Sequence, residues 1–173
     1  MRVFISINLP ESVKKEIKKI QDSLPNFTGK KTEYENLHLT LKFLGEIDEE
    51  NLPKIRKKLG TIKFKKFEAE IDRIGMFFRY DAGIIWLHLT NCDELQKTAD
   101  NALGSLFEKE KRFMSHLTIA RVKEVKNKKK FTDELSKINM PKKSFIIDMF
   151  FLMKSRLDPK GPAYSIIEEF LLI

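Results

Sequence analysis

Seven apolar-rich stretches of the chain, of which 3–9 alternates and is rich in Val, Ile and Phe, predict β-strands. The expected strands are 3–9, 38–47, 64–77 (one strand or a pair), 83–90, 115–122, 144–153 and 163–173. Between them, apolar residues recur every three or four positions, the spacing of one face of an amphipathic α-helix. The expected helices are 10–24, 48–60, 93–110 and 131–139.

The order strand, helix, His-Leu-Thr strand, helix, strand occurs twice, with halves at about 1–78 and 83–173. A phenylalanine follows the histidine of that strand by 29 residues in each half, at Phe67 and Phe145. A diverged duplication is therefore plausible. No low-complexity linker separates the halves, so 1–173 is predicted to be a single domain of two packed lobes.

The chain has three histidines, and each is followed by Leu-Thr. Residues two apart in a strand point to the same face, so His38 with Thr40, and His116 with Thr118, each present an imidazole beside a hydroxyl. The first and third histidines lie on equivalent strands, and an approximate two-fold would bring them face to face. His88 lies on a different strand of the repeat, so it is expected to lie elsewhere and to be structural.

Two opposed imidazoles fit the chemistry of a phosphodiester, because one can take a proton while the other gives one near neutral pH. Hydroxyls beside them can donate to the non-bridging phosphate oxygens. Other chemistries fit less well. The sequence has no recognisable zinc-ligand spacing and no glycine-rich phosphate loop, and Cys92 has no obvious partner that would make it a nucleophile.

The composition is typical of a soluble globular protein, with 42% hydrophobic and 34% charged residues. A net charge of +8 fits RNA, DNA or acidic membrane partners, and equally a lysine-rich solvated surface. The single cysteine, Cys92, cannot form an internal disulfide, which suits a reducing cytosol. The N-terminus lacks the apolar stretch of a signal peptide, and the longest apolar run is interrupted by Asp148. We therefore expect a soluble, cytoplasmic protein with no membrane partner.

Five segments together resemble a known family. They are the opening RVFISINLPESV, the first motif ENLHLTLKFLGE, the strand IIWLHL, the second motif SHLTIARVK and the ending KSRLDPKGPAYSII. Over essentially the whole chain they are similar to the two-histidine phosphoesterases, in particular the RNA 2′,3′-cyclic phosphodiesterases, also called 2′-5′ RNA ligases. The paired His-x-Thr motifs, at this separation and with these flanks, carry the resemblance.

The resemblance implies a bilobal α+β fold in which two pseudo-symmetric antiparallel sheets line a central cleft, with helices outside. It matches His38 and His116 with the catalytic histidines. Thr40 and Thr118 match the phosphate-binding threonines. By that analogy His38 is the proton donor to the departing 3′ oxygen and His116 is the proton acceptor that activates water. The two motifs are too similar for the sequence alone to assign these roles.

Arg121 matches an arginine that follows the second motif in the family, which implies that it binds substrate phosphate. Strict alternation along the strand places Arg121 on the face opposite to His116. The predicted role therefore requires a β-bulge or a strand end between the two residues.

The function implied is metal-independent hydrolysis of RNA 2′,3′-cyclic phosphate ends to 2′-phosphomonoesters, with no cofactor. The same site run in reverse joins a 5′-hydroxyl to the cyclic phosphate without ATP, and the sequence does not separate the two directions. The alternatives are a non-catalytic RNA-binding module and a phosphodiesterase for a small cyclic nucleotide or sugar phosphate. The partner is RNA, with a monomer expected, and the candidates for stacking the terminal base are Phe77, Phe78, Tyr80 and Phe113.

Overall fold

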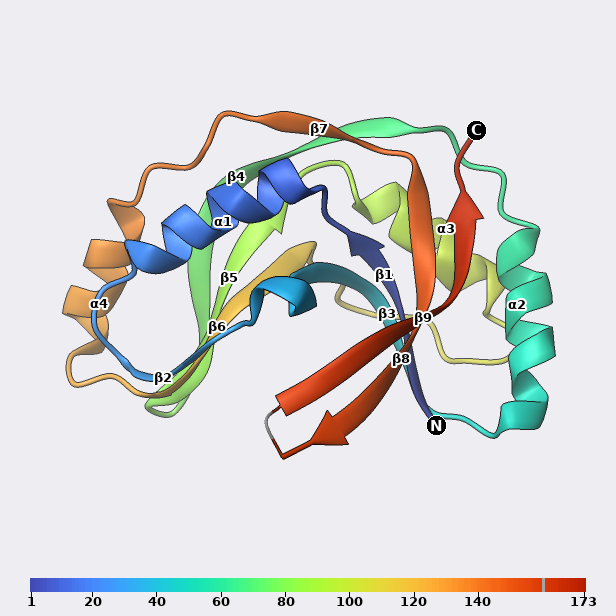
Figure 1. Cartoon of the computed structure of the whole chain (residues 1–173), viewed down its shortest axis with the longest axis horizontal. Helices are drawn as coiled ribbons and strands as arrows, with labels where there is room; N and C mark the ends of the chain where they lie inside the picture. Colours follow the sequence, from blue (N-terminus) through green and yellow to red (C-terminus); the bar gives the residue numbers. More distant parts are fainter. Residues whose placement is uncertain (160) are drawn as a thin grey trace.

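The computed structural model describes residues 1–159 and 161–173, and it contains two antiparallel sheets with helices packed outside them (Figure 1). One sheet has the order β3-β1-β8-β9, with β1 Arg2–Asn8, β3 His38–Glu46, β8 Met149–Asp158 and β9 Gly161–Leu171. The other has the order β2-β6-β5-β4-β7, with β2 Thr28–Lys31, β4 Phe67–Arg79, β5 Ala82–Leu89, β6 His116–Glu124 and β7 Ser144–Ile147. The α-helices are α1 Glu11–Asp22, α2 Leu52–Gly60, α3 Asp93–Ala102 and α4 Lys128–Ser136. The predicted α+β class with two antiparallel sheets is confirmed.

Each sheet combines strands from both halves of the chain. The N-terminal strands β2 and β4 belong to the second sheet, and the C-terminal strands β8 and β9 belong to the first. Strands β4 and β7 run antiparallel beside each other (Figure 1), and the register pairs Phe67 with Ile147 and Ala69 with Phe145. The two phenylalanines that share a spacing in the sequence therefore lie on neighbouring strands, two residues apart in the register.

The apolar stripes predicted from the helical period face the core. In α1, Val13, Ile17 and Ile20 are buried, and in α3, Leu95 and Ala99 are buried. Burying a side chain the size of Ile or Leu contributes about 1.5–3 kcal/mol, so these stripes fix the helices on the sheets. In the described part of the chain, no helix is long and apolar enough to cross a membrane.

The helix predicted for 93–110 is wrong at its C-terminal end, because α3 stops at Ala102. The chain turns at Leu103 and Gly104, and the backbone N–H of Glu110 donates to the Asp100 carboxylate over 2.7 Å. A tertiary contact of Asp100 thus takes the segment 103–115 away from the helix axis. The strand predicted for 144–153 is likewise divided at Asp148 into β7 and β8.

Strand β2 has no counterpart among the predicted strands. It is short and fully exposed, and it pairs with the edge of β6. A side chain at Gly29 would place a Cβ atom only 2.2 Å from the backbone oxygen of Arg121, so this close pairing requires glycine. The buried Gln21 of α1 donates to the backbone oxygen of Ile119 over 2.9 Å, which ties the helix to the same strand.

Candidate active site

A β-bulge in β6 moves Arg121 to the face that carries His116. The register with β5 shifts between Ala120 and Thr118, so Ile119 has no cross-strand partner. Ile119 and Ala120 are both buried, and Arg121 is exposed on the other side. The bulge on which the predicted placement of Arg121 depended is therefore present.

The first His-Leu-Thr strand has the same irregularity. In β3 the register with β1 shifts so that Leu41 has no partner, and Leu41 and Lys42 are both buried. The next residue, Phe43, emerges on the face of His38 and is 72% exposed. Phe43 and Arg121 are thus equivalent positions of the repeat with unlike chemistry, one aromatic and one cationic.

A cavity of about 430 Å³ lies between the two sheets, and the five predicted site residues all line it: His38, Thr40, His116, Thr118 and Arg121. This volume is within the usual range for a small-ligand site. Two further residues of the cavity, Phe43 and Leu157, are exposed by 72% and 71%. The cavity therefore combines a polar floor with an apolar wall.

Both histidine rings are oriented by a hydrogen bond to the backbone carbonyl two residues earlier in the chain. The Nδ1 atom of His38 lies 2.8 Å from the carbonyl oxygen of Asn36, and that of His116 lies 2.8 Å from the carbonyl oxygen of Met114. A carbonyl only accepts, so Nδ1 carries a proton in each ring and Nε2 is the ring nitrogen left for other partners. The Nε2 of His38 is 3.0 Å from the hydroxyl oxygen of Thr40.

The two histidines differ in their surroundings. The ring of His38 packs against Phe4 and Tyr164, with ring centroids 5.0 and 5.1 Å apart. Burial lowers the pKa of His38 below its ordinary value; the hydrogen bond to Asn36 opposes this, and the positive charges of Lys14 and Arg121 add to it. These surroundings favour the neutral imidazole of His38.

Sequence reasoning missed Phe43 and Tyr164 as residues of the cavity. For Phe43 a signal existed, since it holds the place in the first motif that Arg121 holds in the second. Tyr164 lies in the C-terminal segment that carries the family resemblance, but only the fold shows that β9 brings it to the His38 ring. Burial raises the pKa of Tyr164, so its hydroxyl stays protonated and can donate a hydrogen bond.

The expectation that His88 lies elsewhere is wrong. His88 on β5 is the direct cross-strand partner of His116 on β6, so the two side chains share a face. Its Nδ1 donates to the carboxylate of Asp72 over 2.6 Å. Local sequence position could not reveal this adjacency, because it depends on the register of two separate strands.

None of the four aromatic residues predicted to stack a base lines this cavity. Phe77 lies on the other side of His116, with ring centroids 5.4 Å apart. Phe78 is next to it in the strand, and its ring lies 5.7 Å from the ammonium nitrogen of Lys128. The expectation that all four lie in loops is wrong for Phe77 and Phe78, which belong to β4.

Cys92 does not have the properties of a nucleophile. Its side chain is buried, and burial raises the pKa of the thiol to about 12. The reactive thiolate is therefore scarce near neutral pH. In the described part of the chain, no group of three or more His, Cys, Asp or Glu side chains is arranged to hold a metal ion.

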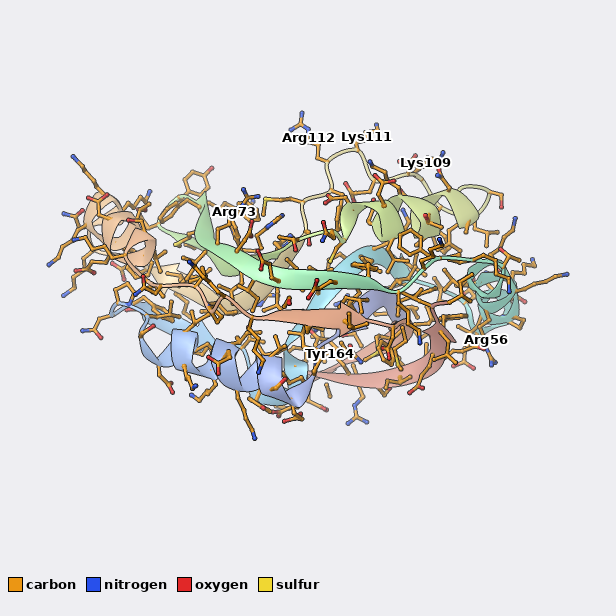
Figure 2. The ribbon with its side chains drawn as sticks, turned by 90° about the horizontal axis from the view of Figure 1, so that it is seen from above. Arg56, Arg73, Lys109, Lys111, Arg112 and Tyr164 are labelled. Atoms are coloured by element: carbon orange, nitrogen blue, oxygen red, sulfur yellow. The ribbon has the colours of Figure 1, made fainter. Side chains whose placement is uncertain are left out.

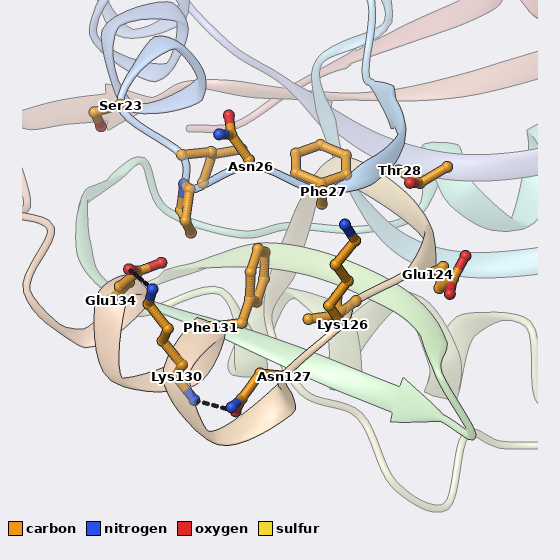
Figure 3. A pocket seen from close by; sticks show the side chains of 13 residues that line it. Ser23, Asn26, Phe27, Thr28, Glu124, Lys126, Asn127, Lys130, Phe131 and Glu134 are labelled. Atoms are coloured by element: carbon orange, nitrogen blue, oxygen red, sulfur yellow. Dashed lines mark hydrogen bonds and ion pairs between the residues drawn. The ribbon is translucent and has the colours of Figure 1, made fainter.

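A larger cavity of about 760 Å³ lies between the end of α1 and the start of α4 (Figure 3). Lys126 and Lys130 line it together with Glu124 and Glu134, so its charges balance. It is lined by no histidine and by neither His-x-Thr motif. We therefore assign the chemistry to the smaller cavity, where the paired motifs converge.

Two antiparallel sheets with a His-x-Thr pair from each facing one cavity define the class of two-histidine phosphoesterases. Residues 7–86 and 90–164 match the LigT-like phosphoesterase family. A Methanocaldococcus jannaschii protein named RNA 2′,3′-cyclic phosphodiesterase is 38% identical over 98% of this chain and 99% of its own. A Thermotoga maritima protein of the same name is 33% identical over 98% and 94%.

Solved structures agree with this assignment. A Thermus thermophilus crystal structure has a TM-score of 0.80 and 27% identity, covering 99% of this chain and 97% of that one. The Escherichia coli LigT structure with 3′-AMP has a TM-score of 0.82 at 23% identity, covering 99% and 97%, and supports the fold. The chain belongs to the LigT-like phosphoesterase family.

Proposed function

We propose that the protein opens 2′,3′-cyclic phosphate ends of RNA by hydrolysis, giving 2′-phosphomonoesters without a metal ion. The observation that carries the proposal is the convergence of both His-x-Thr pairs on one cavity. The names of the relatives, RNA 2′,3′-cyclic phosphodiesterase, support the substrate. Two titratable imidazoles supply the acid and the base that the reaction needs.

In the proposed reaction, His116 takes a proton from water as the water oxygen forms a bond to phosphorus. The bond from phosphorus to the 3′ oxygen breaks, and His38 gives its proton to that oxygen. Thr40 and Thr118 donate hydrogen bonds to the non-bridging oxygens, where negative charge accumulates. The 2′ oxygen keeps the phosphate.

The donor role requires a protonated His38, whereas burial favours its neutral form. An anionic phosphate close to the ring favours the imidazolium by Coulomb attraction. We therefore propose that substrate binding itself charges His38. The Arg121 guanidinium has no ion-pair partner among the described residues and binds the same phosphate. Its positive charge partly offsets the attraction between that phosphate and the His38 imidazolium.

Phe43 is the proposed platform for the terminal base, because it is the exposed aromatic of the cavity wall. Stacking on an aromatic side chain contributes about 1–3 kcal/mol per base. We expect Phe43→Ala to raise KM for a cyclic-phosphate oligonucleotide by about tenfold, with a smaller effect on kcat. Steady-state kinetics checks this prediction, with Phe78→Ala as the control because it removes an aromatic outside the cavity. Equal KM values for the two variants would refute the stacking of the base on Phe43.

Phosphorus NMR of an oligonucleotide ending in 2′,3′-cyclic phosphate, with chelator present, tests the proposed function. A 2′-phosphate product is the expected result. A 3′-phosphate product would mean that the 2′ oxygen leaves instead of the 3′ oxygen. Loss of activity on addition of chelator would contradict the metal-free mechanism. Tight RNA binding without turnover identifies a binding module. Faster turnover of a cyclic mononucleotide than of the oligonucleotide identifies a small-molecule phosphodiesterase.

A further inference from the structure

Asn36 contacts two parts of the candidate active site at once. It ends the one-turn 3₁₀-helix η1 (Tyr34–Asn36), two residues before His38. Its backbone oxygen accepts the hydrogen bond from Nδ1 of His38 over 2.8 Å. Its side-chain amide donates to the backbone oxygen of Pro162, near the start of β9, over 2.9 Å. A single residue thus links the ring of the proposed proton donor to a strand 126 residues further along the chain.

The start of β9 also carries the ring that packs on His38. Tyr164 lies two residues after Pro162 and well inside the outline of the molecule (Figure 2). Its ring meets that of His38 edge-on, with centroids 5.1 Å apart, and Phe4 packs against both rings. The Nε2 atom of His38 lies 3.0 Å from the hydroxyl oxygen of Thr40, so the orientation of the ring determines where its proton is delivered.

Strand pairing alone does not bring Tyr164 to His38. The registers place Tyr164 opposite Ser155, and Ser155 opposite Arg2 at the start of β1. His38 is opposite Asn8, at the other end of β1. The two ends are separated by the length of a seven-residue strand, about 20 Å. The contact of the two rings therefore depends on the twist of the sheet and on bonds between segments that the register does not join.

Two contacts hold the start of β9 against the segment that precedes β3. One is the hydrogen bond from Asn36 to Pro162. The other is at Gly161, where an added Cβ atom would lie 3.4 Å from the ammonium nitrogen of Lys30, which forms an ion pair with Glu33. Only the first of these contacts is made by a residue that also orients an imidazole ring of the candidate site.

The second half of the chain does without this side chain. The residue two positions before His116 is Met114, whose backbone oxygen accepts from that ring over 2.8 Å. A methionine side chain has no N–H or O–H group to donate. The backbone contact to the imidazole therefore does not require an asparagine. The amide of Asn36 has a role that only the first half needs, which is to hold the start of β9.

We propose that Asn36 is a positioning residue for the proton donor: by holding the start of β9, its amide keeps Tyr164 against the His38 ring and so directs Nε2 toward the departing 3′ oxygen. The inference rests on the proposed function, since it uses His38 as the donor. The amide itself transfers no proton. It limits the orientations of a ring that has to lie within hydrogen-bond reach of its target, where a small misplacement lowers the rate.

The test compares a substrate that needs the donor with one that does not. We expect Asn36→Ala to lower kcat for an oligonucleotide 2′,3′-cyclic phosphate about tenfold, the equivalent of one hydrogen bond. On an aryl phosphodiester, whose leaving group needs no proton, the same variant should keep the wild-type kcat. Steady-state kinetics on both esters measures this difference, whereas a general loosening of the fold would lower both rates.

Asn91→Ala is the matched control. The Asn91 amide donates to the backbone oxygen of Glu68 over 2.8 Å, the same kind of contact at a place that does not line the cavity. This variant is expected to leave kcat on both esters unchanged. Thermal melting of both variants compares the stability that each lost hydrogen bond costs.

A double-mutant cycle keeps the inference testable if Asn36→Ala also loses stability. Tyr164→Ala removes the ring that the Asn36 amide is proposed to hold, so the two changes should not be additive. Added to Tyr164→Ala, the Asn36→Ala change should lower kcat on the cyclic phosphate by only about twofold or less. A full tenfold effect in that background overturns the inference.

An NMR titration of His38 in the free protein gives a readout that does not depend on activity. Burial lowers the pKa of His38, and release of Tyr164 exposes the ring, so this pKa should rise toward its ordinary value in Asn36→Ala. Lys14 on α1 and Arg121 on β6, whose charges also lower it, stay in place in this variant. An unchanged titration contradicts the inference.

The kinetic outcomes separate this inference from the proposed function. Equal kcat of wild type and Asn36→Ala on the cyclic phosphate overturns the positioning role and leaves the hydrolase standing. Similar losses on both esters also overturn it. A higher KM with unchanged kcat would mean that the amide binds the substrate directly, which overturns it as well. Cyclic ends that the wild type leaves unopened remove the proposed function itself.

Discussion

His116→Ala is expected to lower kcat/KM for opening a 2′,3′-cyclic phosphate by about 10²–10⁴-fold, the usual contribution of one general acid or base. His38→Ala is expected to cause a loss of similar size on this substrate. An aryl phosphodiester separates the two roles, because its leaving group needs no proton. On that ester His38→Ala should keep most of the wild-type rate, whereas His116→Ala should lose as much as before.

Thermal melting of both variants serves as the control, since a loss of fold would mimic a loss of catalysis. Equal losses for His38→Ala on the two esters, with His116→Ala spared on the aryl ester, would mean that the roles are exchanged. The lowered pKa of His38 gives the exchanged assignment a physical basis, because a neutral imidazole in the free enzyme is suited to act as the base. Retained activity of both variants on both esters would refute two-histidine catalysis.

Lys42→Ala is expected to destabilise the fold by about 3–5 kcal/mol, the cost of leaving a buried charge without its partner. The Lys42 ammonium donates to the Asp100 carboxylate over 2.5 Å and to the carbonyl oxygen of Glu108 over 2.6 Å, and both charged side chains are buried. For a chain of this size that loss lowers Tm by roughly 6–20 °C. Differential scanning calorimetry measures it.

The double variant Lys42→Met with Asp100→Asn removes both charges but keeps an acceptor oxygen for the Glu110 N–H, and it should recover much of the stability, because a buried ion pair contributes little against neutral residues of similar volume. Ala120 holds the position equivalent to Lys42, so the strand itself does not need the lysine. Lys54→Met, at an exposed site on α2, is the control and should change Tm little. If Lys42→Ala lowers Tm no more than Lys54→Met does, the ion pair of Lys42 with Asp100 is not a stabilising contact.

The sequence by itself predicted most of the elements and both His-x-Thr pairs. Alternation and helical spacing identified most strands and helices, because both periods are local properties of the backbone. His38 with Thr40, and His116 with Thr118, could be paired from sequence for the same reason: residues two apart share a face of their own strand. The repeat then indicated that the two pairs belong together.

The tertiary structure alone decided the surroundings of that pair. The bulges at Leu41 and Ile119 bring Phe43 and Arg121 onto the cavity face, and a bulge depends on the partner strand as well as on the bulged one. The same is true of His88, whose place beside His116 is a matter of register between separate strands. Local patterns do not encode register, because it is set by the packing of segments far apart in the chain.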